Sequence, residues 1–577
     1  MKAWHCTAAT ICGLVAGSMQ MAHAQQSVPS PSQVAPPEIR PAPSAPTRIL
    51  LPRVEVGQAV PEQAKKLNFI LTGFDIEGEF AELEAQRREL ERSLVGKRVT
   101  VAQVFEFGAA LQALYVRAGY PLVRVIVSPQ ELDKAARVKI RVVDGFIERI
   151  DAEAIASLTR PRVVAVLERL IGKRHLTQGE LERQLLIAGD APGLELNAVF
   201  TGGKEIGGSI LVLSGRYKPV SASIYGDNAM PVVFGTGQMV TSASLNGVLG
   251  LGEQVSVSAS GLPDADFVTA NPTRRYLSAT VMIPLGVDGW RVEASGTQGK
   301  TTPRVDPIFS SQGLLTQGRV KLAFDAVKRR DAELTLSGRL DSTDEEVDSL
   351  LFTPAIPLSR DRLRVVRAAA DGIWRLRESG TVVSYGAMVS QGLNALGART
   401  AADASPLLPL SRAGADAVFT KFEGRFQVTQ NLPENFFVSL AAFGQTSFNR
   451  PLLKSEQYDL VGAQMLSGYN AGSFAGDSAW ATRAEIGRNI AWPSEILPIV
   501  LTPYLFGASG ERLLAQPSAL ELASLHASNL GGGLRLYLPV FGTFPASFSG
   551  FVEGSRQHSN DPTQQGWRLF AGGSLHY

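Results

Sequence analysis

From about residue 217 to the end, the chain consists of short segments in which apolar and polar side chains alternate, and the spacing of an amphipathic helix is absent. The clearest examples are Val255–Ala259, Leu277–Ile283, Ala332–Leu340, Phe436–Ala442 and Leu534–Leu538. In the second and third of these, Thr, Ser, Glu and Arg share one face, while Leu, Ile, Val and Ala share the other. Because side chains on a strand alternate with a period of two, such strands can separate lipid from a water-filled lumen. A soluble β-sandwich would also alternate, so placement in a membrane depends on the rest of the chain.

The end of the chain adds a more specific feature. One face of the expected last strand carries Trp567, Leu569, Ala571, Gly573, Leu575 and Tyr577. The opposite face carries Arg568, Ser574 and His576. An alternating strand that ends the chain with an aromatic residue is typical of bacterial outer-membrane barrels. We therefore expect Leu575 and Tyr577 to form the signal that the barrel-assembly machinery of the outer membrane recognises.

The first two dozen residues have the features of a secretory signal peptide. Lys2 and His5 provide a short polar start, Ala8–Ala16 is apolar, and Ala22–Ala24 provides a small-x-small cleavage site. We expect cleavage after Ala24. The rest of the chain contains no apolar run of about eighteen residues, so no transmembrane helix is expected. A secreted chain of this kind can enter a membrane only as a closed barrel, which pairs all its backbone polar groups.

Few residues are available for thiol or metal chemistry. Both cysteines, Cys6 and Cys12, lie in the expected signal peptide, so we expect no disulfide, thiol catalyst or cysteine-bound metal in the mature chain. The histidines beyond the signal are His175, His526, His558 and His576. No two of them have the spacing of metal ligands, and we expect neither a metal site nor a cofactor. The formal net charge of +2 provides no electrostatic basis for binding nucleic acid.

Residues 25–63 form a separate zone that is rich in Pro, Ser, Ala and Gln. Its prolines include Pro29, Pro31, Pro36, Pro37, Pro41, Pro43, Pro46 and Pro52. Such a composition buries no core and favours extended, polyproline-like states. We interpret this zone as a flexible linker. The alternative is a docking motif for another protein.

Two similar units follow the linker, at residues 64–145 and 146–216. Each unit begins with a strand, continues through two helices and ends with two strands. The expected helices are Ala81–Leu94, Val101–Ala118, Arg162–Ile171 and Thr177–Ala188. The predicted fold is therefore two tandem α+β modules followed by an all-β transmembrane barrel of antiparallel strands over 217–577. At roughly ten residues per strand plus turns, this barrel would have about 14 to 18 strands, enough to enclose a channel.

The order of these zones resembles the outer-membrane transporters of two-partner secretion, of the haemolysin-secretion and filamentous-haemagglutinin-exporter type. The two α+β units are similar to the POTRA domains of these proteins, and the resemblance covers about residue 64 to the end. The matching stretches are Gly119-Tyr120, Val127–Leu132, Val142–Ile147, Arg183–Gly193, Asp227-Asn228 and Gly250–Gln254. The resemblance implies a 16-stranded barrel in the bacterial outer membrane, with the POTRA modules in the periplasm.

The resemblance also implies a sixth extracellular loop that folds back into the barrel. In the family this loop carries a Val-Arg-Gly-Tyr motif, and its arginine pairs with the aspartate of a Phe-x-Asp motif in a later strand. The matching positions here are Leu466-Ser467-Gly468-Tyr469 and Phe506-Gly507-Ala508, so both charges are missing. Losing both charges together can be nearly neutral, whereas one unpaired charge inside a barrel is costly. We expect a tucked loop held by Tyr469 and its glycine-rich backbone; the alternative is a looser loop with altered export.

The function implied by the resemblance is export of a partner protein. The POTRA pair would capture the partner in unfolded form, and the barrel would pass it to the cell surface across the lipid bilayer. A small sheet leaves an edge with unpaired N–H and C=O groups, so we expect capture by strand addition. The candidate edges are Leu122–Val127, which includes Val125, and Leu194–Val199, which includes Asn197.

Three alternatives to this function remain open from the sequence. A barrel-assembly or insertion factor also joins POTRA modules to a barrel. A diffusion porin would have no need of two periplasmic modules. A diverged transporter could carry a non-classical cargo.

Two further motifs and one absence bear on catalysis. Ala294–Thr301 fits a relaxed phosphate-loop pattern, but such a loop must open a helix, and prolines follow in a zone of strands; we expect a hairpin loop. Asp341–Asp348 is acidic but lacks the glycine turn and ligand spacing of an EF-hand, and we expect a solvated loop. The chain contains no Gly-x-Ser-x-Gly elbow, so we expect no enzyme activity.

Overall fold

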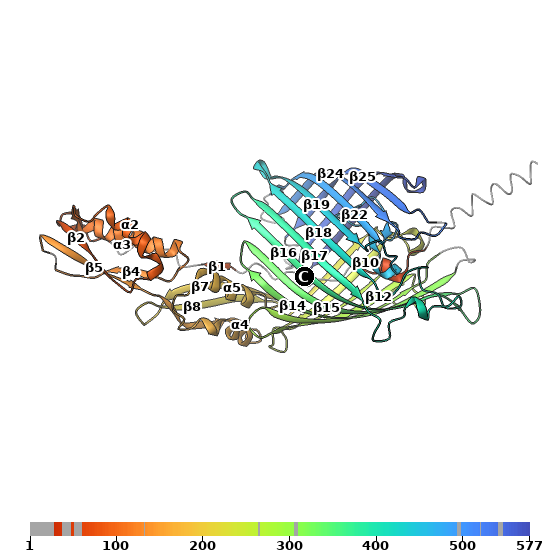
Figure 1. The fold of residues 1–577 in the computed structure, drawn as a ribbon, viewed down its shortest axis with the longest axis horizontal. Helices are drawn as coiled ribbons and strands as arrows, with labels where there is room; N and C mark the ends of the chain where they lie inside the picture. The colour runs from red at the N-terminus through yellow and green to blue at the C-terminus, as the bar shows by residue number, and fades with distance from the viewer. Residues whose placement is uncertain are drawn as a thin grey trace, which may run out of the picture.

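The computed structural model describes residues 28–36, 48–50, 60–131, 133–262, 266–304, 310–492, 498–519, 521–539 and 546–577. The expected signal peptide, residues 1–24, lies outside the described residues. Two small α+β modules extend from one end of a closed barrel, and the whole molecule is elongated (Figure 1). We call the barrel end next to the modules the near rim and the opposite end the far rim.

The first module is a four-stranded sheet with two helices. Its elements are β2 (Asn68–Glu77), α2 (Glu84–Arg92), β3 (Arg98–Thr100), α3 (Val101–Arg117), β4 (Arg124–Val127) and β5 (Ala135–Val143). The strand order is β3-β2-β5-β4, so β3 and β4 are the edges. Thr100 begins α3 with a capping box, in which its hydroxyl accepts from the Gln103 N–H. Apolar residues of α3 pack on the sheet, and the rings of Phe74 and Phe107 stack 4.1 Å apart.

The second module repeats the strand-helix-helix-strand-strand order. Its elements are β6 (Phe146–Ala154), α4 (Arg160–Leu167), α5 (Gln178–Gly189), β7 (Leu194–Gly202) and β8 (Gly208–Tyr217). A short strand from the proline-rich zone, β1 (Arg48–Leu50), completes the sheet in the order β1-β7-β8-β6. Thr177 and Glu180 form the capping box at the start of α5. No helix among the described residues is long and apolar enough to cross a membrane.

The barrel wall is a closed ring of 16 antiparallel strands, when β22 and β23 are counted as one interrupted strand, and this number confirms the expectation. Its strands are β9 (Val220–Asp227), β10 (Gln238–Asn246), β11 (Gln254–Gly261), β12 (Arg274–Leu285), β13 (Trp290–Thr301), β14 (Ser311–Lys328), β15 (Ala332–Ser349), β16 (Ile356–Leu376), β17 (Thr381–Gly392), β18 (Thr420–Asn431), β19 (Phe436–Thr446), β22 (Ser478–Arg488), β23 (Ile490–Trp492), β24 (Ile499–Leu513), β25 (Ser524–Leu538), β26 (Ser547–Ser559) and β27 (Gly566–His576). β22 and β23 both pair with β24 and share one position. Pairing of β27 with β9 closes the barrel.

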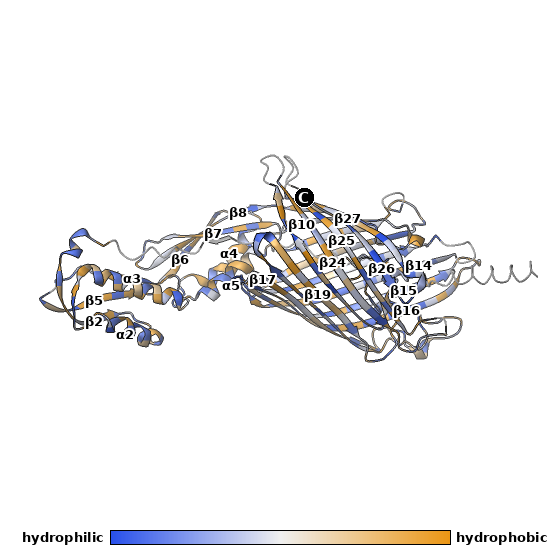
Figure 2. Ribbon diagram, turned by 90° about the horizontal axis from the view of Figure 1, so that it is seen from above, coloured by the Kyte–Doolittle hydropathy of each residue, from blue (hydrophilic) through white to orange (hydrophobic). Residues whose placement is uncertain are grey.

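The alternation predicted from the sequence separates the two faces of the barrel wall. Apolar side chains such as Leu277, Leu336 and Leu340 are exposed on the outer face. Their neighbours on the same strands, such as Ser278 and Arg339, form polar contacts on the lumenal face. The hydropathy colouring accordingly alternates along the barrel strands (Figure 2).

Two segments that we expected to be loops lie in strands. Ala294–Thr301 belongs to β13, so the prediction of a hairpin loop is wrong there. The acidic run Asp341–Asp348 belongs to β15 and is not a solvated loop. Arginines of β16 pair with its outward carboxylates: Arg360 lies directly opposite Glu346, at 2.6 Å, and Arg364 reaches Asp344 diagonally, at 2.7 Å. These cross-strand pairs offset the repulsion that would otherwise keep an acidic strand from forming.

The second module is attached to the near rim by polar contacts. Arg183 donates to the carbonyl oxygens of Asp288 at 2.9 Å and Asp325 at 2.8 Å. Lys328 forms an ion pair with Asp190 at 2.8 Å. These contacts place α5 beside the turn between β12 and β13 and beside the near end of β14.

Candidate functional site

Loop 6 (residues 447–477) connects β19 to β22 and folds back into the lumen, where its tip, Leu466–Tyr469, is buried. The Tyr469 hydroxyl lies 2.8 Å from Ser528 O and 2.9 Å from His558 O, both on the barrel wall. The side-chain amide of Gln557 donates to Gly468 O. A Cβ at Gly468 would lie 2.9 Å from the Ser555 hydroxyl, so the close approach of tip and wall requires a glycine.

The tip also contacts an arginine that belongs to the barrel wall. Arg483 of β22 donates to the Ser467 hydroxyl at 2.8 Å and forms an ion pair with Glu553 at 2.8 Å. Its guanidinium lies 3.7 Å from the centre of the Phe506 ring, and Ala508 is its cross-strand partner on β24. The two motifs singled out from the sequence are therefore brought together by Arg483.

Arg483 belongs to a charged network that our sequence analysis did not identify. Arg535 donates to Glu485 at 2.8 Å, and the Tyr504 hydroxyl donates to Glu553 at 2.6 Å. The charged side chains of this network line a cavity of ≈ 330 Å³, which Ala463 and Gln464 of loop 6 also line. The sequence signal was present, since Arg483 and Glu485 occupy alternate positions of a strand whose other face is apolar. Alternating charges show only that they face the lumen, because their partners lie on strands distant in the sequence.

A second charged cluster holds the other side of loop 6. Glu456 pairs with Arg367 of β16 at 2.6 Å and with Lys421 of β18 at 2.9 Å. Arg367 also pairs with Asp341 of β15 at 2.6 Å. Each of these side chains is buried, and ionised hydrogen bonds of this kind are stronger than neutral ones. The loop therefore spans the lumen from β16 and β18 to β25 and β26.

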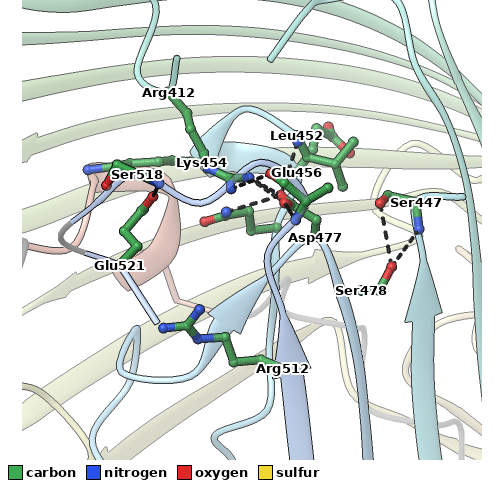
Figure 3. Close-up of polar contacts among 12 residues, drawn as sticks. Arg412, Ser447, Leu452, Lys454, Glu456, Asp477, Ser478, Arg512, Ser518 and Glu521 are labelled. Atoms are coloured by element: carbon green, nitrogen blue, oxygen red, sulfur yellow. Dashed lines mark hydrogen bonds and ion pairs between the residues drawn. The ribbon is translucent and has the colours of Figure 1, made fainter. Parts of the chain in front are cut away.

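The last residue of loop 6, Asp477, joins three loops at the far rim. Arg412, from the loop between β17 and β18, contacts its carboxylate, and so does the Leu452 N–H at 3.0 Å (Figure 3). The Ala515 N–H, from the loop between β24 and β25, donates to it at 2.8 Å. One buried carboxylate thus links loop 6 to the loops between β17 and β18 and between β24 and β25.

Residues 28–36 also lie inside the lumen, close to the far rim (red segment inside the barrel in Figure 1). Pro31–Val34 forms a 3₁₀ turn, and Val34 is fully buried against Phe234 and Leu315. The prediction of a flexible linker over 25–63 is therefore wrong for this stretch and for β1. Its composition builds no core of its own, but both stretches dock on surfaces supplied by the rest of the chain.

The lumenal wall differs between its two sides. Loop 6 and its charged clusters occupy the side formed by β15–β26. The middle of β9–β13 instead carries hydroxyl side chains: Ser221, Ser223, Ser242, Ser244, Ser256, Ser258, Ser278 and Thr297. Several of these hydroxyls pair across strands, with Ser223–Ser242 at 2.7 Å and Ser278–Thr297 at 2.9 Å. Because they satisfy one another, this side presents a polar but uncharged surface.

Comparison with known proteins identifies the architecture. A family model described as haemolysin secretion/activation protein ShlB/FhaC/HecB matches residues 207–523, more than half of the chain. The chain belongs to this family. A second model, the ShlB-type POTRA domain, matches residues 69–145. The protein is thus a two-partner secretion transporter of the outer membrane, with its POTRA modules and near rim on the periplasmic side. It is a transporter that exports a partner protein, and the family is not one of enzymes.

Individual relatives are distant in sequence but similar in fold. The heme/hemopexin transporter protein HuxB of Haemophilus influenzae is 20% identical over 406 residues, which are 68% of this chain and 67% of HuxB. The structure of CdiB from Escherichia coli has a TM-score of 0.67 at 18% identity and covers 91% of this chain and 93% of CdiB. CdiB from Acinetobacter baumannii has a TM-score of 0.57 at 14% identity, covering 98% and 97%. At these identities the structural likeness shows the fold alone.

The first candidate capture edge of the transporter, Leu122–Val127, is only partly a free edge. β4 is an edge strand, but it begins at Arg124, and Leu122 is buried in the core of the second POTRA module. The Val125 N–H is bonded to the Gln112 side chain at 3.1 Å. Leu122 therefore lies outside the edge strand, and the Val125 N–H already has a partner within the module. The role of this edge in capture stays a prediction.

The second candidate edge, Leu194–Val199, is occupied by the transporter's own β1. Arg48, Ile49 and Leu50 pair in parallel with Asn197, Ala198 and Val199 of β7. Leu194 is buried in the module core and Val199 is exposed. This edge accepts a strand, but in this conformation the strand comes from the same chain.

The last strand of the transporter closes the barrel. Leu575 and Tyr577 face outward, and Leu575 pairs with Ile224 of β9. The backbone of Tyr577 exchanges two hydrogen bonds with Ala222, at 2.9 and 3.3 Å. The predicted role of these residues in recognition by the assembly machinery stays a prediction.

Proposed function

We propose that this transporter captures its partner protein in unfolded form by strand addition to β7 of the second POTRA module, and passes it through the lumen to the cell surface. The observation that supports this proposal is the pairing of β1 with β7. An extended partner segment offers the same backbone groups as β1 and can replace it at the same edge. Strand addition uses backbone groups, so the edge suits many sequences.

The closed lumen defines what must move during export. Loop 6 and residues 28–36 occupy the outer part of the channel, and both are held by side chains of the wall. Export therefore requires their displacement. Folding of the partner outside the cell provides the free energy, since the chain contains no nucleotide-binding loop.

The test compares the proteins at the surface of cells with and without this transporter. We expect loss of the transporter to remove one secreted protein, encoded by the neighbouring reading frame, while other outer-membrane barrels keep their abundance. Depletion of many barrels would instead assign the chain to barrel assembly. A chain lacking residues 66–215 should insert its barrel without exporting the partner, and undiminished surface display by this variant would contradict capture by the POTRA modules.

A further inference from the structure

In the outer part of the lumen, three side chains of the barrel wall bind main-chain atoms of residues 28–36. The Tyr276 hydroxyl donates to Pro31 O at 2.5 Å, and the Arg274 guanidinium donates to Val34 O at 3.0 Å. The Glu345 carboxylate accepts from the Ser32 N–H at 2.9 Å. Arg274 and Tyr276 belong to β12 and Glu345 to β15. None of these three bonds depends on the side chains of the bound segment.

The same site has binding capacity that residues 28–36 do not use. Arg274, Tyr276 and Glu345 are at most 2% exposed. Among the described residues, Arg274 Nε and Glu345 Oε1 have no hydrogen-bond partner. Burying a charged group without its full set of hydrogen bonds is costly, so an unused donor and acceptor in one site indicate a ligand with more backbone to offer.

The site also has one apolar pocket and a defined approach. Val34 fills a pocket lined by Met230, Phe234 and Leu315, which has room for a small aliphatic side chain. Below Tyr276 on the same strand, Ser278 begins the hydroxyl-lined side of the wall. A polypeptide moving along that uncharged side would reach Arg274 and Tyr276 at its outer end.

We propose that Arg274, Tyr276 and Glu345 form a binding site for the main chain of the exported polypeptide, and that residues 28–36 occupy this site in the closed transporter. The proposal rests on the proposed function, because it requires that a polypeptide passes through the lumen. It assigns the ligand class: extended, uncharged segments with small aliphatic side chains. The resident segment and the exported chain then compete for the same three side chains.

The test uses the full-length transporter in planar lipid bilayers. The probe is a synthetic unfolded polypeptide of Ser, Gly, Thr and Val, added from the periplasmic side. Tyr276→Phe removes one hydroxyl–carbonyl bond, so it should raise the open probability and shorten the current blockades by the probe about two- to tenfold. Tyr217→Phe is the matched control, because its hydroxyl also bonds a carbonyl, Asn246 O, but at the near rim.

A second variant displaces the resident segment without changing the three side chains. A Cβ at Gly313 would lie 2.3 Å from the Pro31 ring and 2.6 Å from the Thr301 hydroxyl of the wall, so Gly313→Ala should displace the segment and raise the open probability. A Cβ at Gly318, on the same strand, meets nothing within 4 Å, which makes Gly318→Ala the control. With Gly313→Ala, blockades by the proline-free probe should last as long as in the unaltered transporter.

The outcomes separate this proposal from the proposed function. If Tyr276→Phe raises the open probability but leaves the blockade durations unchanged, the site binds only residues 28–36 and the proposal is overturned. If neither quantity changes, the site does not hold the segment and the proposal is equally overturned. Export of the partner, measured on cells, would stand in both cases.

Discussion

Arg483 on the barrel wall donates a hydrogen bond to Ser467 at the tip of loop 6, across 2.8 Å. The resemblance to the family places an arginine in the loop itself. Here the positive charge belongs to β22, and its carboxylate partner, Glu553, belongs to β26. The ion pair therefore stays within the wall, and the loop tip contributes only uncharged groups to its hydrogen bonds with the wall. Withdrawal of this tip from the lumen does not separate two opposite charges.

Replacing Arg483 with methionine should destabilise the barrel strongly. The change leaves Glu553 buried with only Tyr504 as partner, and breaking a buried pair typically costs about 3–5 kcal/mol. Arg425→Met is the matched control, because its pair with Asp371 is exposed to the water of the lumen and contributes little. Heat-modifiable migration on gels, followed over temperature, measures the loss. Equal melting of the two variants would show that the Arg483 network is not structural.

Restoring the two charges of the family motif one at a time should destabilise the barrel to different extents. Ser467→Arg places a second cation beside Arg483 and should destabilise, whereas Ala508→Asp gains Arg483 as its cross-strand neighbour and should cost less. In the double variant the new arginine and aspartate can pair, and the double-mutant cycle should show favourable coupling of about 0.5–3 kcal/mol. Zero coupling would mean that the positions do not adjoin.

Ile49→Pro should open the β7 edge. Proline removes a backbone donor and restricts the preceding residue, so β1 can no longer pair with Asn197–Val199. We expect faster hydrogen exchange of the β7 amides and tighter capture of the partner. Ile49→Ala keeps the backbone donor and is the control. Unchanged exchange in the proline variant would argue against β1 as the strand that covers this edge.

Tyr577→Asp should block assembly of the barrel. The variant places a charge on the outward face at the closing strand, where Tyr577 bonds the backbone of Ala222. His576→Asp, one residue away and facing the lumen, should assemble normally. The amount of folded barrel in membrane fractions distinguishes them, and normal amounts for Tyr577→Asp would remove the assembly role of the terminus.

The features that follow from local periodicity were predictable from the sequence. Alternation in Leu277–Ile283 and Ala332–Leu340 indicated which side chains meet lipid, and the capping residues Thr100 and Thr177 marked the helices of the modules. These patterns explain why the predicted fold class agrees with the structure. Length and pattern alone gave about 14 to 18 strands, and the number 16 came from the resemblance to the family.

The features that depend on distant partners were not predictable. Residues 28–36 have the composition of a linker, and nothing in them encodes the side chains of β12 and β15 that bind them. Asp341–Asp348 looked like a loop because the arginines that pair with it lie on the next strand. The role of Arg483 could not be predicted, because its partners Ser467 and Glu553 are 16 and 70 residues away in the sequence and are brought to it only by the fold.

The length of the strand pairs gives the barrel a mechanical asymmetry. β15 and β16 pair along Ala332–Ser349, whereas the pairing of β27 with β9 covers Gly572–His576, with further backbone hydrogen bonds at Ala571 and Tyr577. Resistance to shear between two strands grows with the number of hydrogen bonds that join them. The wall around β15 and β16 is therefore the stiffer side of the barrel. The compliant side is the closing seam, next to the hydroxyl-lined strands. A bulky segment entering the lumen would therefore widen the barrel at that seam, without loosening β16 and β18, which hold Glu456 of the loop.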